Sequence, residues 1–238
     1  MALAEEVASR IASVRRDVAD AARRAGRSPG DVTIVAVTKT LPPDAVRLAA
    51  ESGLSDVGEN YVQEARDKQR QVASGSRWHL IGTLQRNKTK TAARLFDRVH
   101  TLDGPQVADA LDAAAALRPA PLPVLVQVNT APHLARRGVR PDELAPFVRH
   151  LATRRSLALD GLMTIAPPHL APDETRGHFR LLRELRDDTA EAVGLELVHL
   201  SMGMSEDFRI AVEEGTTLLR LGRALFGPRN AGPWREEP

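Results

Sequence analysis

Lysine is scarce in this chain, and one lysine stands at the end of a segment that should be buried. The 238-residue sequence contains 29 arginines but four lysines, namely Lys39, Lys68, Lys88 and Lys90. Lys39 follows the apolar run at residues 33–38, which has the composition of a buried strand. An amine placed there can lose its proton and attack a carbonyl carbon to form a Schiff base, which a guanidinium cannot do. The position equally suits a lysine that ends a strand and reaches solvent.

A second group of residues, near the end of the chain, could bind an anion. Gly222 and Arg223 follow the apolar run at 217–221 and open a helical turn. Backbone amides at such a turn can donate to a phosphate, and glycine permits its close approach. The preceding segment supplies the hydroxyl groups of Ser201 and Ser205. The alternative makes the glycines ordinary turn residues and Ser205 a helix N-cap. The combination favours a phosphate site.

Two further polar residues interrupt apolar strands. Arg220 lies within the run 218–221, and a buried guanidinium needs a partner because an unpaired buried charge is strongly destabilising. That partner could be a carboxylate such as Glu59, or else a ring nitrogen or an anionic ligand. His79 is a candidate with a weaker case, since a lone histidine in a strand is more often a hydrogen-bonded core residue than a catalyst. A Schiff-base lysine, a phosphate site and a donor to a ring nitrogen together fit pyridoxal 5′-phosphate (PLP).

The elements that must position these residues alternate along the chain. Residues 3–25 have the spacing of an amphipathic helix, which Gly26 ends. Strands are predicted near 33–38, 56–58, 78–81, 98–101, 124–128, 159–164, 196–200 and 217–221. Helices are predicted near 43–52, 61–72, 87–95, 105–117, 142–152, 173–192 and 205–214, and from residue 223.

Eight strand-then-helix units in a chain of this length predict an α/β fold, a single-domain (β/α)8 TIM barrel with an extra N-terminal helix. The alternative is an open doubly wound sheet, but no Gly-x-Gly-x-x-Gly run follows the first strand. In a barrel the residues after the strands share one mouth, so the polar groups above should gather there. We expect one domain over 1–238, with the helix inside 1–27 and a frayed tail at 228–238.

Composition excludes several other classes of function. The chain has no cysteine, which removes disulfides, thiolate zinc sites and a cysteine nucleophile. Its formal charge is +2, and its arginine pairs are dispersed among acidic residues, which is typical of solvated helix faces and argues against nucleic-acid binding. No apolar run is long enough for a membrane span, no signal peptide is indicated, and no histidine spacing suggests a metal site. We expect a soluble, cytoplasmic protein.

Six segments carry a resemblance to a known family. They are residues 35–39 (VAVTK), 58–64 (GENYVQE), 78–88 (WHLIGTLQRNK), 161–167 (GLMTIAP), 200–208 (LSMGMSEDF) and 219–227 (LRLGRALFG). In this order, and over nearly the whole chain, they resemble the pyridoxal phosphate homeostasis proteins. The fold of that family resembles the N-terminal barrel domain of alanine racemase, a PLP enzyme of fold type III.

The resemblance implies a role for each candidate residue. Lys39 would carry the cofactor as a Schiff base. Ser201 and the amides of Gly222 and Arg223 would hold the phosphate, and Arg220 would face the pyridine nitrogen. Asn60 and His79 would line the pocket. Family members bind PLP and influence vitamin B6 balance without an established robust activity, which implies a carrier or buffer with PLP-dependent apoenzymes as transient partners.

One segment departs from the family pattern. The family usually has a Glu and a Lys after the fifth strand, where this chain has His133 and Arg136. The departure casts doubt on a part for this loop in cofactor transfer.

Alternative functions stay open at this point. One is a slow PLP-dependent racemase or lyase with Lys39 as its base, although the only tyrosine, Tyr61, is a weak candidate for a second base. Another is a Schiff-base aldolase that acts without a cofactor. We expect a monomer, because alanine racemase dimers use an additional β-domain for which this chain has no room.

Overall fold

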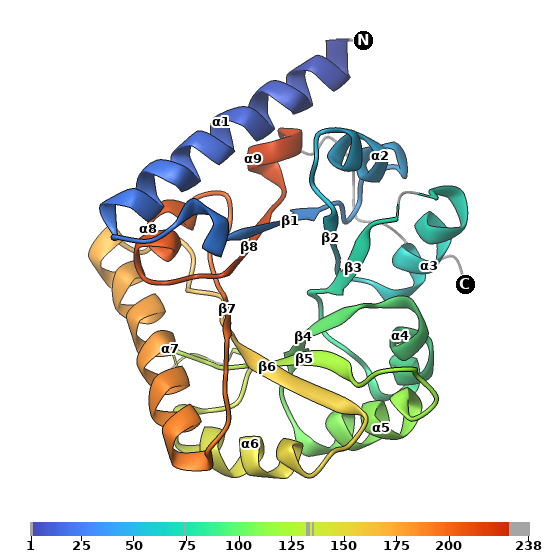
Figure 1. Cartoon of the computed structure of the whole chain (residues 1–238), viewed down its shortest axis with the longest axis vertical. Coiled ribbons are helices and arrows are strands. Elements are labelled where there is room, and N and C mark those ends of the chain that lie inside the picture. Colours follow the sequence, from blue (N-terminus) through green and yellow to red (C-terminus); the bar gives the residue numbers. More distant parts are fainter. Residues whose placement is uncertain (1, 74, 132–133, 135, 229–238) are drawn as a thin grey trace.

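A closed barrel of parallel strands organises the protein. The computed structural model describes residues 2–73, 75–131, 134 and 136–228. Over these residues eight strands pair in sequence order, and the last pairs with the first to close the ring (Figure 1). The strands are β1 Thr33–Val37, β2 Asp56–Glu59, β3 Arg77–Leu80, β4 Arg98–Leu102, β5 Leu122–Gln127, β6 Leu157–Met163, β7 His199–Ser201 and β8 Leu218–Leu221. The predicted TIM barrel is confirmed.

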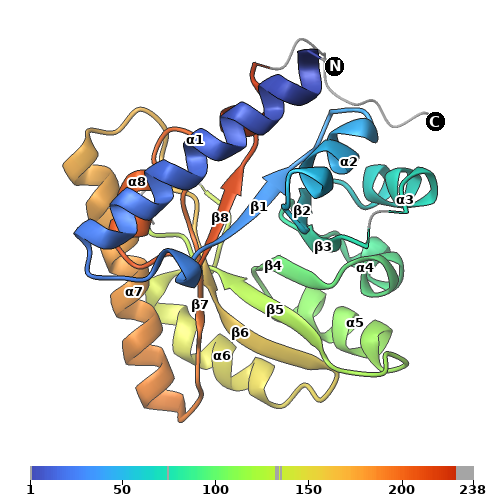
Figure 2. The same ribbon diagram turned by 45° about the horizontal axis from the view of Figure 1, so that its top comes forward.

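Helices follow the strands and cover the outside of the barrel (Figure 2). They are α1 Ala2–Arg24, α2 Asp44–Glu51, α3 Val62–Gln71, α4 Thr89–Leu95, α5 Pro105–Ala115, α6 Leu144–Ala152, α7 Pro172–Val193, α8 Phe208–Glu213 and α9 Arg223–Phe226, with short 3-10 turns η1 Pro29–Asp31, η2 Arg86–Lys88 and η3 Pro141–Glu143. Each predicted helix corresponds to one of these elements.

The two faces of the strands differ in chemistry. Alternate strand residues point outward and inward. The outward ones, such as Ile34, Trp78 and Leu219, join the large apolar core between the barrel and its helices. Several inward ones are polar, including His79 and Arg220, and both are buried. A parallel barrel is covered on both faces, so its strands are nearly continuous apolar runs in which these polar residues stand out.

The N-terminal helix is an addition to the eight repeated units. Its stripe of Val7, Ile11, Val14 and Val18 is buried, as the sequence spacing predicts. The helix packs against α8 and α9 on the outside of the barrel (Figures 1 and 2). It therefore supports the elements that flank β8.

Two element boundaries differ from prediction. β7 begins at His199 because residues 195–198 have no partner strand, and its pairing with β6 starts at Gly161–His199. α8 begins at Phe208 rather than 205, since the side chain of Asp207 accepts a hydrogen bond from the Met204 amide and holds a turn there. Apart from Pro228, the expected frayed tail lies outside the described residues.

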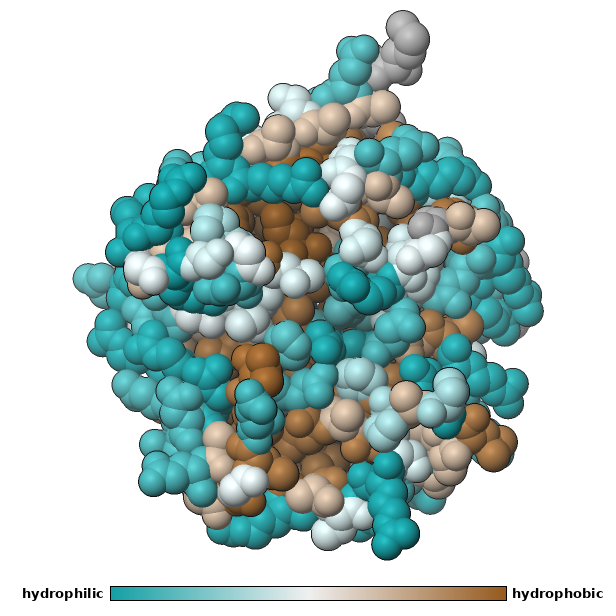
Figure 3. Space-filling view, viewed as in Figure 1, coloured by the Kyte–Doolittle hydropathy of each residue, from teal (hydrophilic) through white to brown (hydrophobic). Residues whose placement is uncertain are grey.

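The visible surface is mostly hydrophilic, with hydrophobic residues in the recesses between polar ones (Figure 3). Of the helices that the structure describes, none combines the length and apolar character that crossing a membrane requires.

Candidate functional site

A cavity of ≈ 550 Å³ opens at the end of the barrel where the strands finish. Its wall includes Lys39 after β1, Asn60 after β2 and, from β8 and the turn that follows, Arg220, Gly222 and Arg223. These five of the seven predicted site residues come together because the carboxyl ends of parallel strands meet at one mouth.

The other two predicted residues lie elsewhere. Ser201 and His79 are buried inside the barrel and are not part of this wall. His79 instead borders a cavity of ≈ 270 Å³ among the strand starts, at the opposite end of the barrel. Strand alternation correctly indicates that both side chains face inward. It does not say how deep they lie, because depth depends on the stagger between strands.

Ser205 occupies the place beside Gly222 that we expected for Ser201. It lines the cavity, and its Oγ accepts a hydrogen bond from the Ala224 amide at 3.0 Å. Ser205 therefore satisfies an amide in the first turn of α9 and does not cap α8, which starts three residues later. Its hydroxyl hydrogen can still be donated toward the cavity.

Four buried polar residues lie beside Lys39, and of these only Glu59 was considered from the sequence, as a partner for Arg220. We call them the rim cluster: Thr38, Glu59, Glu64 and Lys68. Lys68 Nζ donates to Glu59 Oε1 and Glu64 Oε1, both at 2.7 Å. Burial raises the pKa of Glu59 to about 7, although the charge of Lys68 opposes this. Among the described residues, Oε2 of each carboxylate has no hydrogen-bond partner.

The rim cluster holds the backbone on both sides of Lys39. Lys68 Nζ donates to the carbonyl oxygen of Thr38 at 2.6 Å, and the amide of Thr40 donates to Glu64 Oε1 at 2.5 Å. Thr40 has a φ of 63°, which is unfavourable for a β-branched residue and needs support from its surroundings. The sequence signal was the scarcity of lysine together with the Glu64–Lys68 spacing of four on one helix.

A second buried network lies inside the barrel, below the cavity. We call it the interior chain: Asp56, His79, His100 and Ser201. His79 Nε2 lies 2.9 Å from Asp56 Oδ1, and His79 Nδ1 lies 2.9 Å from His100 Nε2. His100 Nδ1 lies 2.9 Å from Ser201 Oγ. The chain links the strand starts to the residues below the cavity.

Arg220 joins the interior chain to the cavity wall. Its Nη1 donates to Ser201 Oγ at 2.7 Å, and its Nη2 donates to the carbonyl oxygen of Thr164 at 2.9 Å. Burial lowers the pKa of Arg220 to about 10, so it remains a cation at neutral pH. The alternative of an ion pair with Glu59 is wrong, because Glu59 pairs with Lys68.

Close backbone approaches shape the cavity rim. A Cβ at position 82 would lie 2.2 Å from the carbonyl oxygen of Asn60, so only glycine allows the loops after β2 and β3 to touch. Gly203 has a φ of 94°, and a Cβ there would lie 2.5 Å from the Cβ of Ala211. Both glycines are required by packing around the mouth.

The loop that departs from the family pattern reaches the cavity. Arg136 is part of the wall, whereas His133 lies outside the described residues. An arginine at 136 places a permanent positive charge there.

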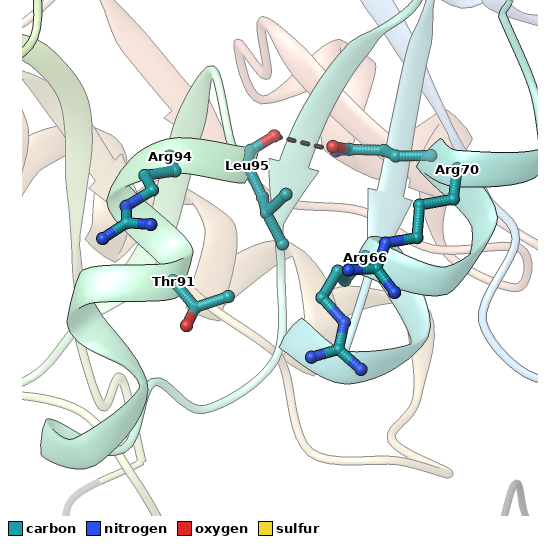
Figure 4. Close-up of a pocket in the computed structure, with 6 residues that line it drawn as sticks. Arg66, Arg70, Thr91, Arg94 and Leu95 are labelled. Atoms are coloured by element: carbon teal, nitrogen blue, oxygen red, sulfur yellow. Dashed lines mark hydrogen bonds between the residues drawn. The ribbon is translucent and has the colours of Figure 1, made fainter.

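A separate surface concavity carries arginines but none of the predicted site residues. It lies between α3 and α4 and is lined by Arg66, Gln69, Arg70, Thr91, Arg94 and Leu95 (Figure 4). Gln69 Nε2 donates to the carbonyl oxygen of Leu95 at 2.8 Å, which ties the two helices together. Arg66 pairs with Asp67. This concavity provides surface arginines for comparison with the buried Arg220.

The chain is similar to known proteins over almost its full length. Residues 10–230 match the family model described as alanine racemase, N-terminal domain. The pyridoxal phosphate homeostasis protein of Pseudomonas aeruginosa is 40% identical over 227 residues, covering 95% of this chain and 97% of that protein. The protein of the same name from Escherichia coli K12 is 36% identical over 234 residues, covering 94% and 97%.

Solved structures agree with this similarity. PipY of Synechococcus elongatus, solved with PLP bound, is 35% identical, with a TM-score of 0.83 over 93% of this chain and 100% of that one. An alanine racemase of Clostridium difficile is 13% identical, with a TM-score of 0.75 over 95% of this chain and 58% of that one, which is a likeness of fold.

Proposed function

Because the chain belongs to the family of pyridoxal phosphate homeostasis proteins, we propose that it binds PLP and buffers or delivers it in vitamin B6 homeostasis. The observation that carries the proposal is the meeting of Lys39, Arg220 and the Gly222–Arg223 turn around one cavity. These residues are separated by up to 184 positions, and only the barrel brings them together.

The residues present fit the chemistry of PLP. An aldehyde needs an amine, a pyridine nitrogen needs a donor, and a phosphate needs cations, hydroxyls or amides. The amine would be that of Lys39, and the donor to the pyridine nitrogen would be Arg220. The phosphate would be bound by Ser205, Gly222 and Arg223. A volume of ≈ 550 Å³ is also within the usual range for small-molecule sites, roughly 300 to 1,000 Å³.

Lys39 would hold the cofactor covalently. Its neutral amine would condense with the aldehyde carbon and release one water molecule. The rim cluster would aid this by holding the backbone at Thr38 and Thr40, which limits the positions that the amine can reach. Asn60 would line the space beside it.

Ser205 would take the phosphate role that the family resemblance assigned to Ser201. The Ser201 hydroxyl already contacts His100 and Arg220, whereas Ser205 lines the cavity beside Gly222. Arg223 would add a positive charge at this end. Its pairing with exposed Glu206 is a surface interaction that an anion could replace.

Arg220 would favour storage over catalysis. When bound, PLP supplies an electron sink for reactions at amino-acid carbons. Arg220 donates hydrogen bonds and stays protonated, so it would leave the pyridine nitrogen without a proton and weaken that sink. Tyr61 is the only tyrosine, is half-exposed and does not line the cavity, so it gives no support to a second catalytic base.

Reductive trapping tests the covalent site. Purified protein loaded with PLP should absorb visible light, and borohydride should bleach it and fix one PLP on the peptide that contains Lys39. The Lys39→Ala variant should carry no adduct, while Lys90→Ala, which changes an exposed lysine, should match the wild type. An adduct on another residue, or none, would overturn the assignment.

Two solution assays separate a carrier from an enzyme. Mixing the loaded protein with a PLP-free apoenzyme should restore the activity of that enzyme, which supports delivery. Incubation with L- and D-alanine, serine and threonine should give no turnover above a Lys39→Ala control. Turnover well above that control would favour the racemase or lyase alternative instead.

A further inference from the structure

The hydrogen bonds of the interior chain run from a donor at one end to an acceptor at the other. Arg220 at the upper end can only donate hydrogen bonds, because a guanidinium has no acceptor. Asp56 at the lower end can only accept while it is ionised. Burial alone would raise its pKa, but hydrogen bonds from His79 and Arg77 hold the pKa below its usual value. With neutral histidines between these ends, every link passes its hydrogen the same way.

This constraint assigns a hydrogen to each link. Ser201 Oγ accepts from Arg220, so its own hydrogen is free to go to His100 Nδ1. His100 then carries its hydrogen on Nε2 and donates to His79 Nδ1. His79 carries its hydrogen on Nε2 and donates to Asp56 Oδ1. In this arrangement each donor meets one acceptor.

The surroundings support a neutral His100. His100 is fully buried, and burial, followed by the nearness of His79 and Arg220, lowers its pKa well below the usual value. A proton added to His100 Nδ1 would point at Ser201 Oγ. The hydroxyl would then lose its acceptor while still accepting from Arg220.

We propose that the interior chain positions the Arg220 guanidinium for the ring of the bound cofactor. Its four members are positioning residues, since they act through Arg220 and do not border the cofactor cavity. This inference rests on the proposed PLP function and deepens it. The interior chain reaches the opposite end of the barrel and would keep Arg220, the donor to the pyridine nitrogen, in place.

The interior chain helps to stabilise the buried charge of Arg220 at the centre of the barrel. Arg220 is buried, and it donates hydrogen bonds to the neutral oxygens of Ser201 and Thr164. Aligned hydrogen bonds polarise one another in a low-dielectric interior, so the negative charge of Asp56 is felt at Ser201 through the two imidazoles. Apolar side chains in the same places would leave an Arg220 donor unpaired, which is strongly destabilising.

Histidine NMR on the PLP-free protein tests the hydrogen assignment directly. Nitrogen-15 spectra should show His100 neutral from about pH 6 to about pH 8, with hydrogen on Nε2 of both His100 and His79. The two residues are identified by the signals that His79→Gln and His100→Asn remove. A protonated His100, or hydrogen on its Nδ1, would overturn the proposal whether or not PLP binds.

A set of matched variants tests the consequence for the cofactor. His100→Phe removes both links and should weaken PLP retention about tenfold, with a shifted absorption maximum. His100→Asn keeps an acceptor near Ser201 and should recover part of the loss. Asp56→Asn should weaken retention by roughly threefold. Asp160→Asn is the control, because Asp160 also pairs with an arginine near the strand starts, Arg98 at 2.8 Å, but lies outside the chain.

The outcomes distinguish this inference from the proposed function. If no variant, wild type included, binds PLP, the proposed function fails while the NMR result stands by itself. If PLP binds and His100→Phe retains the wild-type spectrum and affinity, the positioning role is wrong. Equal effects of Asp56→Asn and Asp160→Asn would also contradict it, because a general loss of stability would then explain both.

Discussion

The two sides of the cavity are supported in opposite ways. On the Lys39 side the rim cluster is ionic and local, made by neighbouring segments from β1 to α3. On the Arg220 side the interior chain is a line of hydrogen bonds between two charged ends, Asp56 and Arg220, and runs from β2 through β3 and β4 to β7 and β8. The rim cluster places opposite charges in direct contact. The interior chain instead links the charge of Asp56 to Arg220 through a series of hydrogen bonds.

Because of this difference, the two sides of the cavity should respond differently to pH. Glu59 in the rim cluster has a pKa of about 7, so its charge changes in the physiological range. In the interior chain the pKa of Asp56 is lowered, that of His100 is lowered well below its usual value, and Arg220 keeps its charge. The covalent side should be sensitive to pH, and the ring-binding side should not.

The largest effect should come from Lys39 itself. Lys39→Ala should lose PLP on the order of 100-fold faster than the wild type, since the covalent bond is gone and only the Arg220 side remains. Gel filtration followed by absorption spectroscopy measures the loss. If Lys39→Ala retained PLP as well as Lys90→Ala does, retention would not depend on a covalent bond to Lys39.

Among these variants, one that breaks the rim cluster should reduce the stability of the protein most. Lys68→Met leaves two buried carboxylates without their cation and should reduce the free energy of unfolding by about 3 to 5 kcal/mol. Lys68→Arg should recover little, because a planar guanidinium cannot reproduce the three contacts of one ammonium. Urea denaturation measures both. Wild-type stability in Lys68→Met would mean that the cluster is not a structural support.

The rim cluster should also give the protein a particular pH dependence. The pKa of Glu59 is raised above its unfolded value, so the folded state binds the extra proton, and this contribution is complete below about pH 4.5. It is lost as pH rises through about 7, by on the order of 3 kcal/mol in total. Urea denaturation of wild type and Glu59→Gln between about pH 5 and pH 8 should show the wild type losing stability relative to the variant. Parallel curves would rule out this role of Glu59.

A conservative change on the other side should have a smaller effect. Arg220→Lys keeps the charge but cannot bond Ser201 and the Thr164 carbonyl in the same geometry. PLP retention should fall about tenfold, with a changed absorption maximum and no new pH dependence between about pH 6 and pH 8. A new pH dependence in that range would remove the distinction between the two sides.

The smallest effect should come from the arginines outside both networks. Arg70→Ala, in the concavity between α3 and α4, should change stability by less than about 0.5 kcal/mol and PLP retention by less than twofold. Denaturation and the retention assay check this. A larger loss of retention would mean that the concavity takes part in binding.

Much of the site could be predicted from residue types and their order. Lys39, Asn60, Arg220, Gly222 and Arg223 were expected at one mouth, and the structure places them around one cavity. The expectation of a shared mouth rests on strand ends that are visible as apolar runs, because a parallel barrel sends all of those ends the same way. Ser201 and His79 were placed at the same mouth by the same reasoning but lie deeper.

The hydrogen-bond partners could not be predicted. His100 and Ser201 are 101 positions apart, and Lys68 sits on a helix that composition alone marks as solvated. Whether two inward-facing residues meet depends on the stagger of eight strands, which pattern and propensity do not encode locally.

The sequence by itself determined the barrel, the family and the choice of lysine at 39, because these depend on residue type, periodicity and order. Only the tertiary structure decided that Lys68 holds the backbone around Lys39, that Ser205 rather than Ser201 borders the cavity, and that His79 and His100 connect Arg220 to Asp56. Those relations arise when distant residues are brought within about 3 Å of one another in a dry interior, where each polar group must find a partner.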